Sequence, residues 1–292
     1  MEPFNKEHFF ALAKPVIETS YFKSLDWQGI DFQNIIENWE DSSDEYDFEE
    51  IMDAAEQVIF GNQTEKMPQP LVVLTDYLYG FAIDQKDANR INDYGTLFYV
   101  GRNGNQNYEK AAYYYQMASD LGCPYSIENL GYIYYYGRTG EINYQKAFLQ
   151  FTKGSAVYNR AISTYKLGDM YKNGYFVTKD IKSAFACYQR AEGLIDNGQN
   201  ENAAASVAPD IYFRLAEAYH YGLGTDVDLK LALSYYQKAE VGFITKVQNG
   251  DFLIKNMLSQ SIDKQEQVRL KIQKDLPQMS WSKKSNTTSK ER

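Results

Sequence analysis

The residue types that most often catalyse reactions or bind metal ions are scarce in this chain. There are two histidines, His8 and His220, and two cysteines, Cys123 and Cys187. Neither pair has the close spacing by which zinc sites and redox motifs are recognised. We therefore expect no catalytic residue, no metal site and no cofactor. His220 is interpreted as a surface or half-buried position of a helix.

Two further segments could carry a function. The glycine-rich stretch 101–104 follows an expected helix, and this context excludes a dinucleotide-binding loop, which follows a strand. Eight acidic residues and no lysine or arginine lie between Glu37 and Glu50. Ser43 or Asp44 could cap a helix whose first turn favours acidic side chains. A docking surface for a basic partner is the alternative, and both interpretations stay open.

The composition limits the classes of partner. The net charge is −9 and the sequence pI about 4.9, which argues against nucleic-acid binding and fits either a basic partner or simple solubility. The 26 tyrosines suit both packing and interfaces. Unpaired cysteines, the absence of a recognisable secretory signal and the absence of a long apolar stretch predict a cytoplasmic protein without a membrane span.

A pattern that recurs four times organises the chain. Each copy closes on a glycine, and these glycines are 36, 37 and 48 residues apart. An alanine follows ten residues later, an aromatic residue four after that, and a small residue seven after the alanine. The closing glycines are Gly101, Gly137, Gly174 and Gly222, and the alanines are Ala111, Ala147, Ala184 and Ala232. Such a period is typical of helical-repeat solenoids.

Each repeat is predicted to hold two helices. Helix A ends at the closing glycine, which can adopt the positive φ of a helix end. After a loop of roughly eight residues, helix B carries the alanine and the second small residue on one face. Bulky residues there would overpack the helix pair.

The flanks of the repeats are predicted to be helical too. We expect helices at 5–22, broken near Pro15, and at 30–39, and a degenerate repeat with helices at 46–60 and 71–83. The 48-residue gap implies an insertion that forms a polar loop near 195–202. Helices at 244–258 and 263–276 would cap the last repeat. The predicted organisation is an N-terminal helical cap at 1–45, the degenerate repeat at 46–92, four repeats at 93–242, C-terminal capping helices at 243–276 and a disordered Ser/Lys-rich tail at 277–292.

The repeated unit resembles the Sel-one-like repeat (SLR) family, which is related to the tetratricopeptide repeats. The second repeat matches the family pattern at Leu130, Gly131, Tyr134, Gly137, Gly140, Lys146, Ala147, Phe151 and Lys153. Gly154, Phe98, Ser183 and Leu231 depart from the pattern. The resemblance implies an all-α fold, a right-handed α/α superhelical solenoid, and a non-catalytic role as adaptor or scaffold in protein complexes. The cysteine pair of the secreted members is missing.

In such solenoids the helix-A face lines the concave groove, where a peptide bearing lysine or arginine would meet tyrosines and acidic neighbours. The candidate protein-binding residues are Tyr99, Tyr132, Tyr135, Tyr136, Asp169, Lys172, Glu217 and Tyr221. For each tyrosine, packing between repeats is the alternative. An acidic immunity-type protein that neutralises a toxin or another partner enzyme is the competing function. The sequence determines neither the partner nor the oligomeric state.

Overall fold

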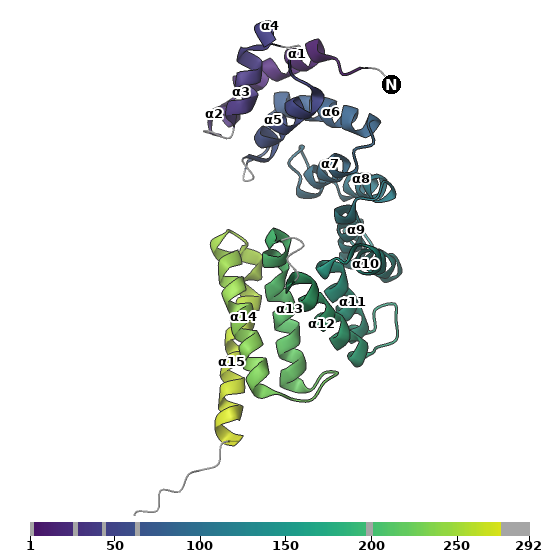
Figure 1. The fold of residues 1–292 in the computed structure, drawn as a ribbon, viewed down its shortest axis with the longest axis vertical. Coiled ribbons are helices and arrows are strands. Elements are labelled where there is room, and N and C mark those ends of the chain that lie inside the picture. Colours follow the sequence, from purple (N-terminus) through teal and green to yellow (C-terminus); the bar gives the residue numbers. More distant parts are fainter. Residues whose placement is uncertain (1–2, 26–28, 43–44, 62–64, 197–200, 276–292) are drawn as a thin grey trace, which may run out of the picture. The chain divides into compact units, whose positions relative to one another are not determined.

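The fold consists of helices stacked in pairs (Figure 1). The computed structural model describes residues 3–25, 29–42, 45–61, 65–196 and 201–275, and all regular elements in these ranges are helical. This confirms the predicted all-α solenoid of helix pairs. By its internal contacts the chain divides into two compact units, Met1–Ser163 (unit 1) and Thr164–Arg292 (unit 2).

The repeats supply four successive pairs of helices A and B. The pairs are α7 (Ala88–Val100) with α8 (Tyr108–Asp120), α9 (Pro124–Tyr136) with α10 (Tyr144–Tyr158), α11 (Ala161–Asn173) with α12 (Ile181–Asp196), and α13 (Glu201–Tyr221) with α14 (Leu229–Gln248). All four closing glycines have positive φ, from 62° at Gly137 to 80° at Gly101. The predicted left-handed helix ends are therefore confirmed.

Close approach between helices A and B depends on a small residue in helix A. A Cβ atom added to Gly95 would lie 2.9 Å from the ring of Tyr115, and one added to Gly168 would lie 2.5 Å from the ring of Tyr188. Tyr115 and Tyr188 are the helix-B aromatics of their repeats, and both are buried. The pattern therefore joins a glycine on one helix to an aromatic ring on the next, which leaves no room for a larger side chain.

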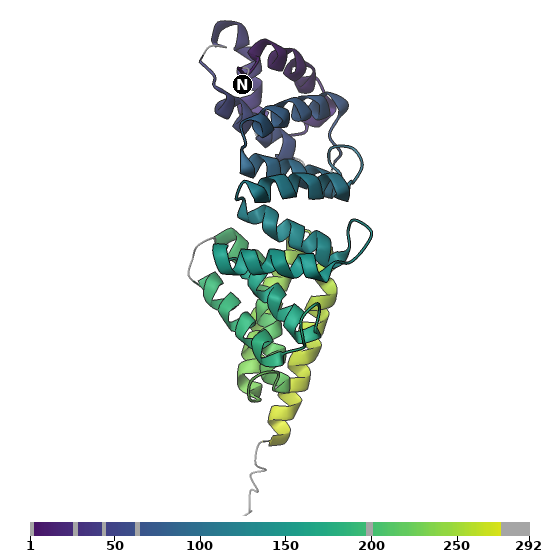
Figure 2. The ribbon, with the colours of Figure 1, turned by 90° about the vertical axis from the view of Figure 1, so that its right-hand side faces the viewer.

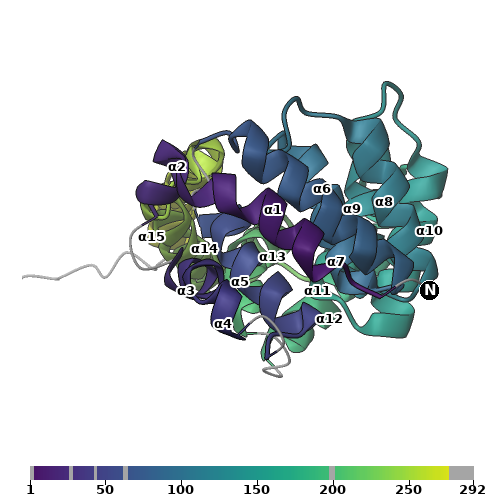
Figure 3. The same cartoon turned by 90° about the horizontal axis from the view of Figure 1, so that it is seen from above.

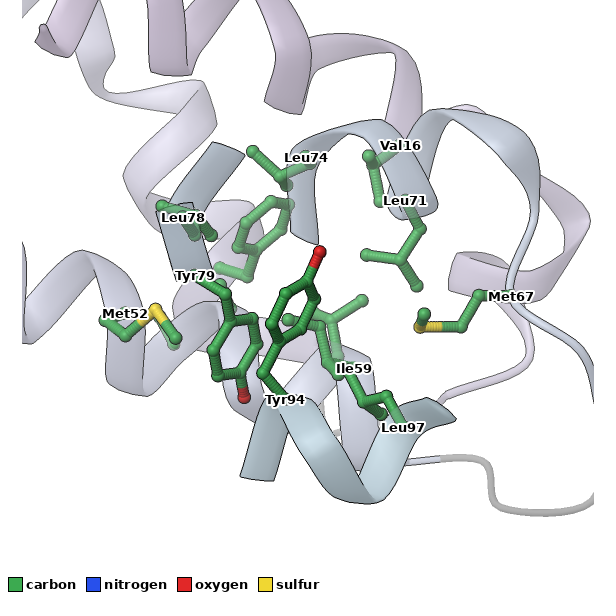
Figure 4. Close-up of a cluster of buried hydrophobic side chains, with 14 of the residues drawn as sticks. Val16, Met52, Ile59, Met67, Leu71, Leu74, Leu78, Tyr79, Tyr94 and Leu97 are labelled. Carbon is green, nitrogen blue, oxygen red and sulfur yellow. The ribbon is translucent and has the colours of Figure 1, made fainter. Parts of the chain in front are cut away.

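Helices before the repeats extend the core of unit 1 toward the N-terminus. They are α1 (Lys6–Ile17), α2 (Ser20–Lys23), α3 (Ile30–Glu37), α4 (Trp39–Ser42), α5 (Phe48–Gly61) and α6 (Gln69–Asp84). α1 packs across α6 (Figures 2 and 3). Val16, Ile59, Leu74 and Leu97, from α1, α5, α6 and α7, share one hydrophobic cluster (Figure 4). The first helices therefore share a core with the first helix pairs.

Hydrogen bonds between distant parts of the chain hold these first helices in place. Tyr21 accepts a hydrogen bond from Arg102 (2.6 Å) and donates one to the carbonyl of Val58 (3.1 Å). Tyr77 donates to the carbonyl of Asn5 at 2.9 Å. These contacts link residues up to 81 positions apart.

Two expectations for unit 1 need correction. Pro15 does not break the first helix, because it lies in the last turn and α1 continues to Ile17. The chain turns at Thr19, whose hydroxyl caps α2. The cap of α5 is Asp47, which accepts from the Glu50 N–H at 2.9 Å while the Glu50 carboxylate accepts from the Asp47 N–H at 3.0 Å. The predicted caps at 43–44 lie outside the described residues.

In unit 2 the predicted insertion and C-terminal helices also differ from the structure. The insertion lengthens helix A of the last repeat, since α13 begins at Glu201 and has 21 residues, whereas 197–200 lie outside the described residues. α14 runs to Gln248, and a turn with Gly250 at φ 93° precedes a 3-10 helix (Phe252–Ile254) and the single helix α15 (Lys255–Asp275). The predicted helices at 244–258 and 263–276 were therefore divided wrongly. The tail at 277–292 is not described.

Candidate functional site

One face of each helix A points away from its helix B. On α9 the residue that meets helix B is Gly131, against Phe151. With 100° of rotation per residue, the opposite face holds Tyr125, Asn129, Tyr132 and Tyr136, which we name the α9 face. Tyr132 lies at its edge, since its ring centre is also 5.9 Å from that of Phe151 in helix B. Tyr125 and Tyr136 are 42% and 47% exposed, and the rings of Tyr132 and Tyr136 stack at 6.0 Å. Unit 1 therefore presents a tyrosine-rich surface on helix A.

Two arginines border the α9 face. The guanidinium of Arg138 lies 5.6 Å from the ring centre of Tyr136, and that of Arg160 lies 4.5 Å from the ring centre of Tyr125. Arg160 also forms an ion pair with Glu128 at 2.6 Å. These cation–π contacts fix the orientation of both rings. The tyrosines of the α9 face are thus held ready to contact another molecule without losing much side-chain entropy.

Acidic side chains occupy the matching face of the neighbouring helices. Arg90 of α7, with a side chain only 10% exposed, contacts Glu49 (2.6 Å), Asp53 (2.8 Å), Asp87 (3.3 Å) and Glu56 (3.7 Å). We name these five residues the Arg90 cluster. Because four carboxylates surround one guanidinium, the cluster keeps an excess of negative charge. Glu49 and Asp53 extend to the surface, where they are 67% and 71% exposed.

The buried end of the Arg90 cluster lies at Glu56. Burial raises the pKa of Glu56 to about 7, although the charge of Arg90 and a hydrogen bond from Tyr79 oppose this, and Asp93 and Asp53 raise it further. Burial also raises the pKa of Asp93. The carboxyl of Glu56 therefore changes its charge near neutral pH, while its surroundings stay acidic.

The titration of Glu56 predicts a pH-dependent effect of Glu56→Gln. Because the folded-state pKa lies above the ordinary 4.5, Glu56 contributes stability at low pH that is lost as the pH rises through about 7. At pH 8 the variant should be more stable than the native chain by about 2 kcal/mol, and at pH 5 the difference should fall below about 1 kcal/mol. Urea unfolding followed by the fluorescence of buried Trp39 measures both. The exposed Glu141→Gln is the control, and equal stabilities at pH 8 would contradict the buried charge.

Of the four predicted site residues in unit 2, Asp169, Lys172 and Glu217 form ion pairs within the unit, and Tyr221 accepts a hydrogen bond from Lys264. Asp169 is buried and forms a bidentate ion pair with Arg214, with distances of 2.5 and 2.6 Å. The hydroxyl of Tyr188 also donates a hydrogen bond to the carboxylate of Asp169 at 3.0 Å. Lys172 contacts Glu217 at 2.9 Å. Burial would raise the pKa of Asp169, yet the charge and hydrogen bonds of Arg214 hold it below its usual value. Asp169 therefore links α11 to α13 and does not line an open groove.

Four segments of the chain match the family model described as Sel1 repeat, namely residues 91–123, 124–149, 161–192 and 209–240. The chain is a Sel1-repeat protein. Repeats of this family generally mediate protein–protein interaction. The match begins within α7, so the pair formed by α5 and α6 lies outside the matched segments.

One solved structure with a TM-score above 0.5 supports this fold. A protective antigen of uropathogenic Escherichia coli strains, c5321, which displays an SLR fold, is 19% identical with a TM-score of 0.53. The alignment covers 80% of this Sel1-repeat chain and 52% of the antigen, so this chain spans about half of its length. A Sel1 repeat protein from Oxalobacter formigenes is 26% identical over 43% of this chain and 90% of its own, with a TM-score of 0.36. No curated protein matches the sequence.

The repeat register explains the remaining predicted tyrosines. Tyr99 and Tyr135 hold the same position in successive Sel1 repeats, four residues after Gly95 and Gly131. Their rings lie 5.1 Å from Tyr108 and 5.6 Å from Tyr144, respectively, at the start of helix B. Both are half-buried and pack between helix A and helix B of their own repeat. They therefore lie beside the outward face, whereas Tyr132 and Tyr136 lie on it.

Sequence reasoning missed Tyr125 and Asn129 of the α9 face. Their distances of seven residues from Tyr132 and Tyr136 place them on the same side of a helix, and this signal was available in the sequence. Asn129 also donates to Asn92 of α7 at 3.0 Å, which ties the faces of α7 and α9 together.

Neither metal binding nor membrane spanning has support in the described ranges. No three His, Cys, Asp or Glu side chains are arranged there to hold a metal ion, and both cysteines are free thiols. No described helix has the length and hydropathy needed to cross a membrane.

Proposed function

We propose that this Sel1-repeat protein is a non-catalytic adaptor that binds a basic segment of a partner protein along the outward face of α5, α7 and α9. The observation that carries the proposal is that unit 1 exposes tyrosines on α9 and carboxylates of the Arg90 cluster on α5, at corresponding positions of the two helices. Residues 1–163 hold 24 acidic and only 12 basic side chains, which favours a cationic partner.

The contacts expected for such a segment differ along the face. Its lysines or arginines would lie near Glu49 and Asp53, whose exposed carboxylates are accessible to a second cation. Its apolar or aromatic residues would pack on Tyr125 and Tyr136, since half-exposed tyrosines are frequent anchors in interfaces. The hydrogen bond from Asn129 to the buried Asn92 holds α9 against α7.

The test is selection of peptides by the full chain. A displayed library of random peptides is enriched on the native protein and on Tyr125→Ala/Tyr136→Ala, and the affinities of the selected peptides are measured by fluorescence anisotropy. We expect peptides rich in lysine or arginine, with an affinity at least tenfold lower for the double variant. Circular dichroism verifies that the helices are intact.

Tyr113→Ala is the matched control, because Tyr113 is an exposed tyrosine of a helix B, at 61% exposure. It should leave the affinity unchanged within twofold. Failure to select peptides rich in lysine or arginine, or equal binding of such peptides by the double variant and the native chain, would overturn the proposal.

A further inference from the structure

The ammonium groups of two lysines of α15 lie against aromatic side chains. Lys264 donates to the hydroxyl of Tyr221 and lies 4.7 Å from its ring centre. Lys271 lies 2.9 Å from Nε2 of His220 and 5.6 Å from the ring centre of Tyr221. No carboxylate of the described residues lies within ion-pair distance of either ammonium group. We name Tyr221, His220, Lys264 and Lys271 the Tyr221 patch.

The proton on His220 can be located from its neighbours. The ammonium group of Lys271 only donates, so Nε2 of His220 accepts and the ring proton lies on Nδ1, 3.4 Å from the hydroxyl of Tyr236. Burial, followed by the charges of Lys271 and Lys264, lowers the pKa of His220 to about 4. The imidazole is therefore neutral at pH 7, and the positive charge of the patch comes from the two lysines.

The patch is open to solvent on the side of the lysines. Tyr221 is 42% exposed, and its ring stacks on His220 at 4.1 Å. Each ammonium group has three donors, so at least one N–H of each can take a further acceptor. The nearest acidic side chain along α13, Glu217, already contacts Lys172 at 2.9 Å. An acceptor with negative charge would thus meet unneutralised cations.

The charge of unit 2 limits the classes of ligand that the Tyr221 patch could bind. Residues 164–275 hold 14 acidic and 14 basic side chains, so the described part of unit 2 has no net charge, whereas domains that bind nucleic acids are usually strongly basic. Within the Tyr221 patch two ammonium groups lie beside one exposed aromatic ring. Such a site fits carboxylate side chains of a protein segment.

We propose that the Tyr221 patch binds an acidic segment of a partner protein, with carboxylates on Lys264 and Lys271 and an adjoining residue packed on Tyr221. This site would be separate from the face proposed for a basic segment, and it takes the opposite charge. The protein would then join an acidic and a basic partner segment through different units.

A labelled hexaglutamate peptide tests the proposal with the full-length chain. We expect saturable binding that weakens about tenfold in Lys264→Gln/Lys271→Gln. The control Lys255→Gln/Lys274→Gln removes the same charge from the same helix and should bind like the native chain. A hexaglutamine peptide should not bind.

The two histidines give a local readout of the same event. Bound carboxylates near Lys271 should shift the imidazole proton signals of His220 and raise its pKa, whereas the signals of His8 in unit 1 stay unchanged. Equal hexaglutamate affinities of the two double variants would overturn the proposal, as would saturation without a shift of His220. Neither result bears on the selection of basic peptides by the α9 face, which uses Tyr125→Ala/Tyr136→Ala.

Discussion

Arg90→Met should lower the free energy of unfolding by about 3–5 kcal/mol at pH 8, because it leaves several carboxylates together without their shared cation. Glu56 and Asp87 cannot move fully into water, since their side chains are only 24% and 31% exposed. At pH 5 the loss should be smaller, because Glu56 is then protonated. Urea unfolding at both pH values, followed by tryptophan fluorescence, measures the difference.

Lys110→Met provides the matched control for Arg90→Met. Lys110 is an exposed cation of unit 1 that lies over the ring of Phe98 and contacts no carboxylate of the described residues. Its replacement should change stability by less than about 0.5 kcal/mol. A loss of under 1 kcal/mol for Arg90→Met would mean that the carboxylates relax into solvent and that the cluster adds little to the fold.

Asp169→Ala should destabilise unit 2 by about 3–5 kcal/mol, because it removes the bidentate partner of the buried guanidinium of Arg214 and leaves only the carboxylate of Asp210, at 3.9 Å, near it. The hydroxyl of Tyr188 would lose its acceptor as well. The paired replacement Asp169→Leu/Arg214→Met should recover most of this loss, since it removes both charges and fills the volume. Urea unfolding followed by circular dichroism at 222 nm measures all three chains.

Asp226→Ala, in the exposed loop between α13 and α14, serves as the control and should leave stability unchanged. The experiment decides whether Asp169 stabilises the fold or contacts a partner. If Asp169→Ala kept full stability and lost affinity for a peptide, the groove assignment made from the sequence would be right and the structural role wrong.

The repeat architecture could be predicted because its signal is local. A glycine that ends a helix, an alanine ten residues later and an aromatic residue four beyond that act within one helix pair. Gly95 meets Tyr115 and Gly168 meets Tyr188 in the same way. The short spacing between these residues therefore determines which helices pack together. Because the spacing recurs in each repeat, the signal is visible in a single sequence.

The site residues were harder to assign, because their roles depend on partners in other repeats. Asp169 and Arg214 are 45 positions apart, as are Lys172 and Glu217. A charged residue on helix A has the same local pattern whether it faces solvent or a residue of the next repeat. Only the structure separates the buried Asp169 from the exposed Tyr136.

Helix ends were mispredicted where a weak signal decided them. Pro15 looked like a break, but in the last turn a proline removes only one backbone hydrogen bond, and α1 tolerates it. The polar stretch before Lys264 looked like a helix end, whereas Gly250 and Asp251 supply the true one. The predicted loop near 195–202 is too long at both ends, because α12 continues to Asp196 and α13 begins at Glu201, and residues 197–200 lie outside the described residues.

The contacts of the first helices have a consequence for synthesis. Most helices pack on their neighbours in sequence, which favours rapid folding. Tyr21 is an exception, because one of its partners, Arg102, is 81 residues away. At about 5–20 residues per second, the ribosome needs several seconds to make this interval. The helices around Tyr21 therefore complete their contacts only after Arg102 has left the ribosome, and during that time their apolar side chains are available to chaperones.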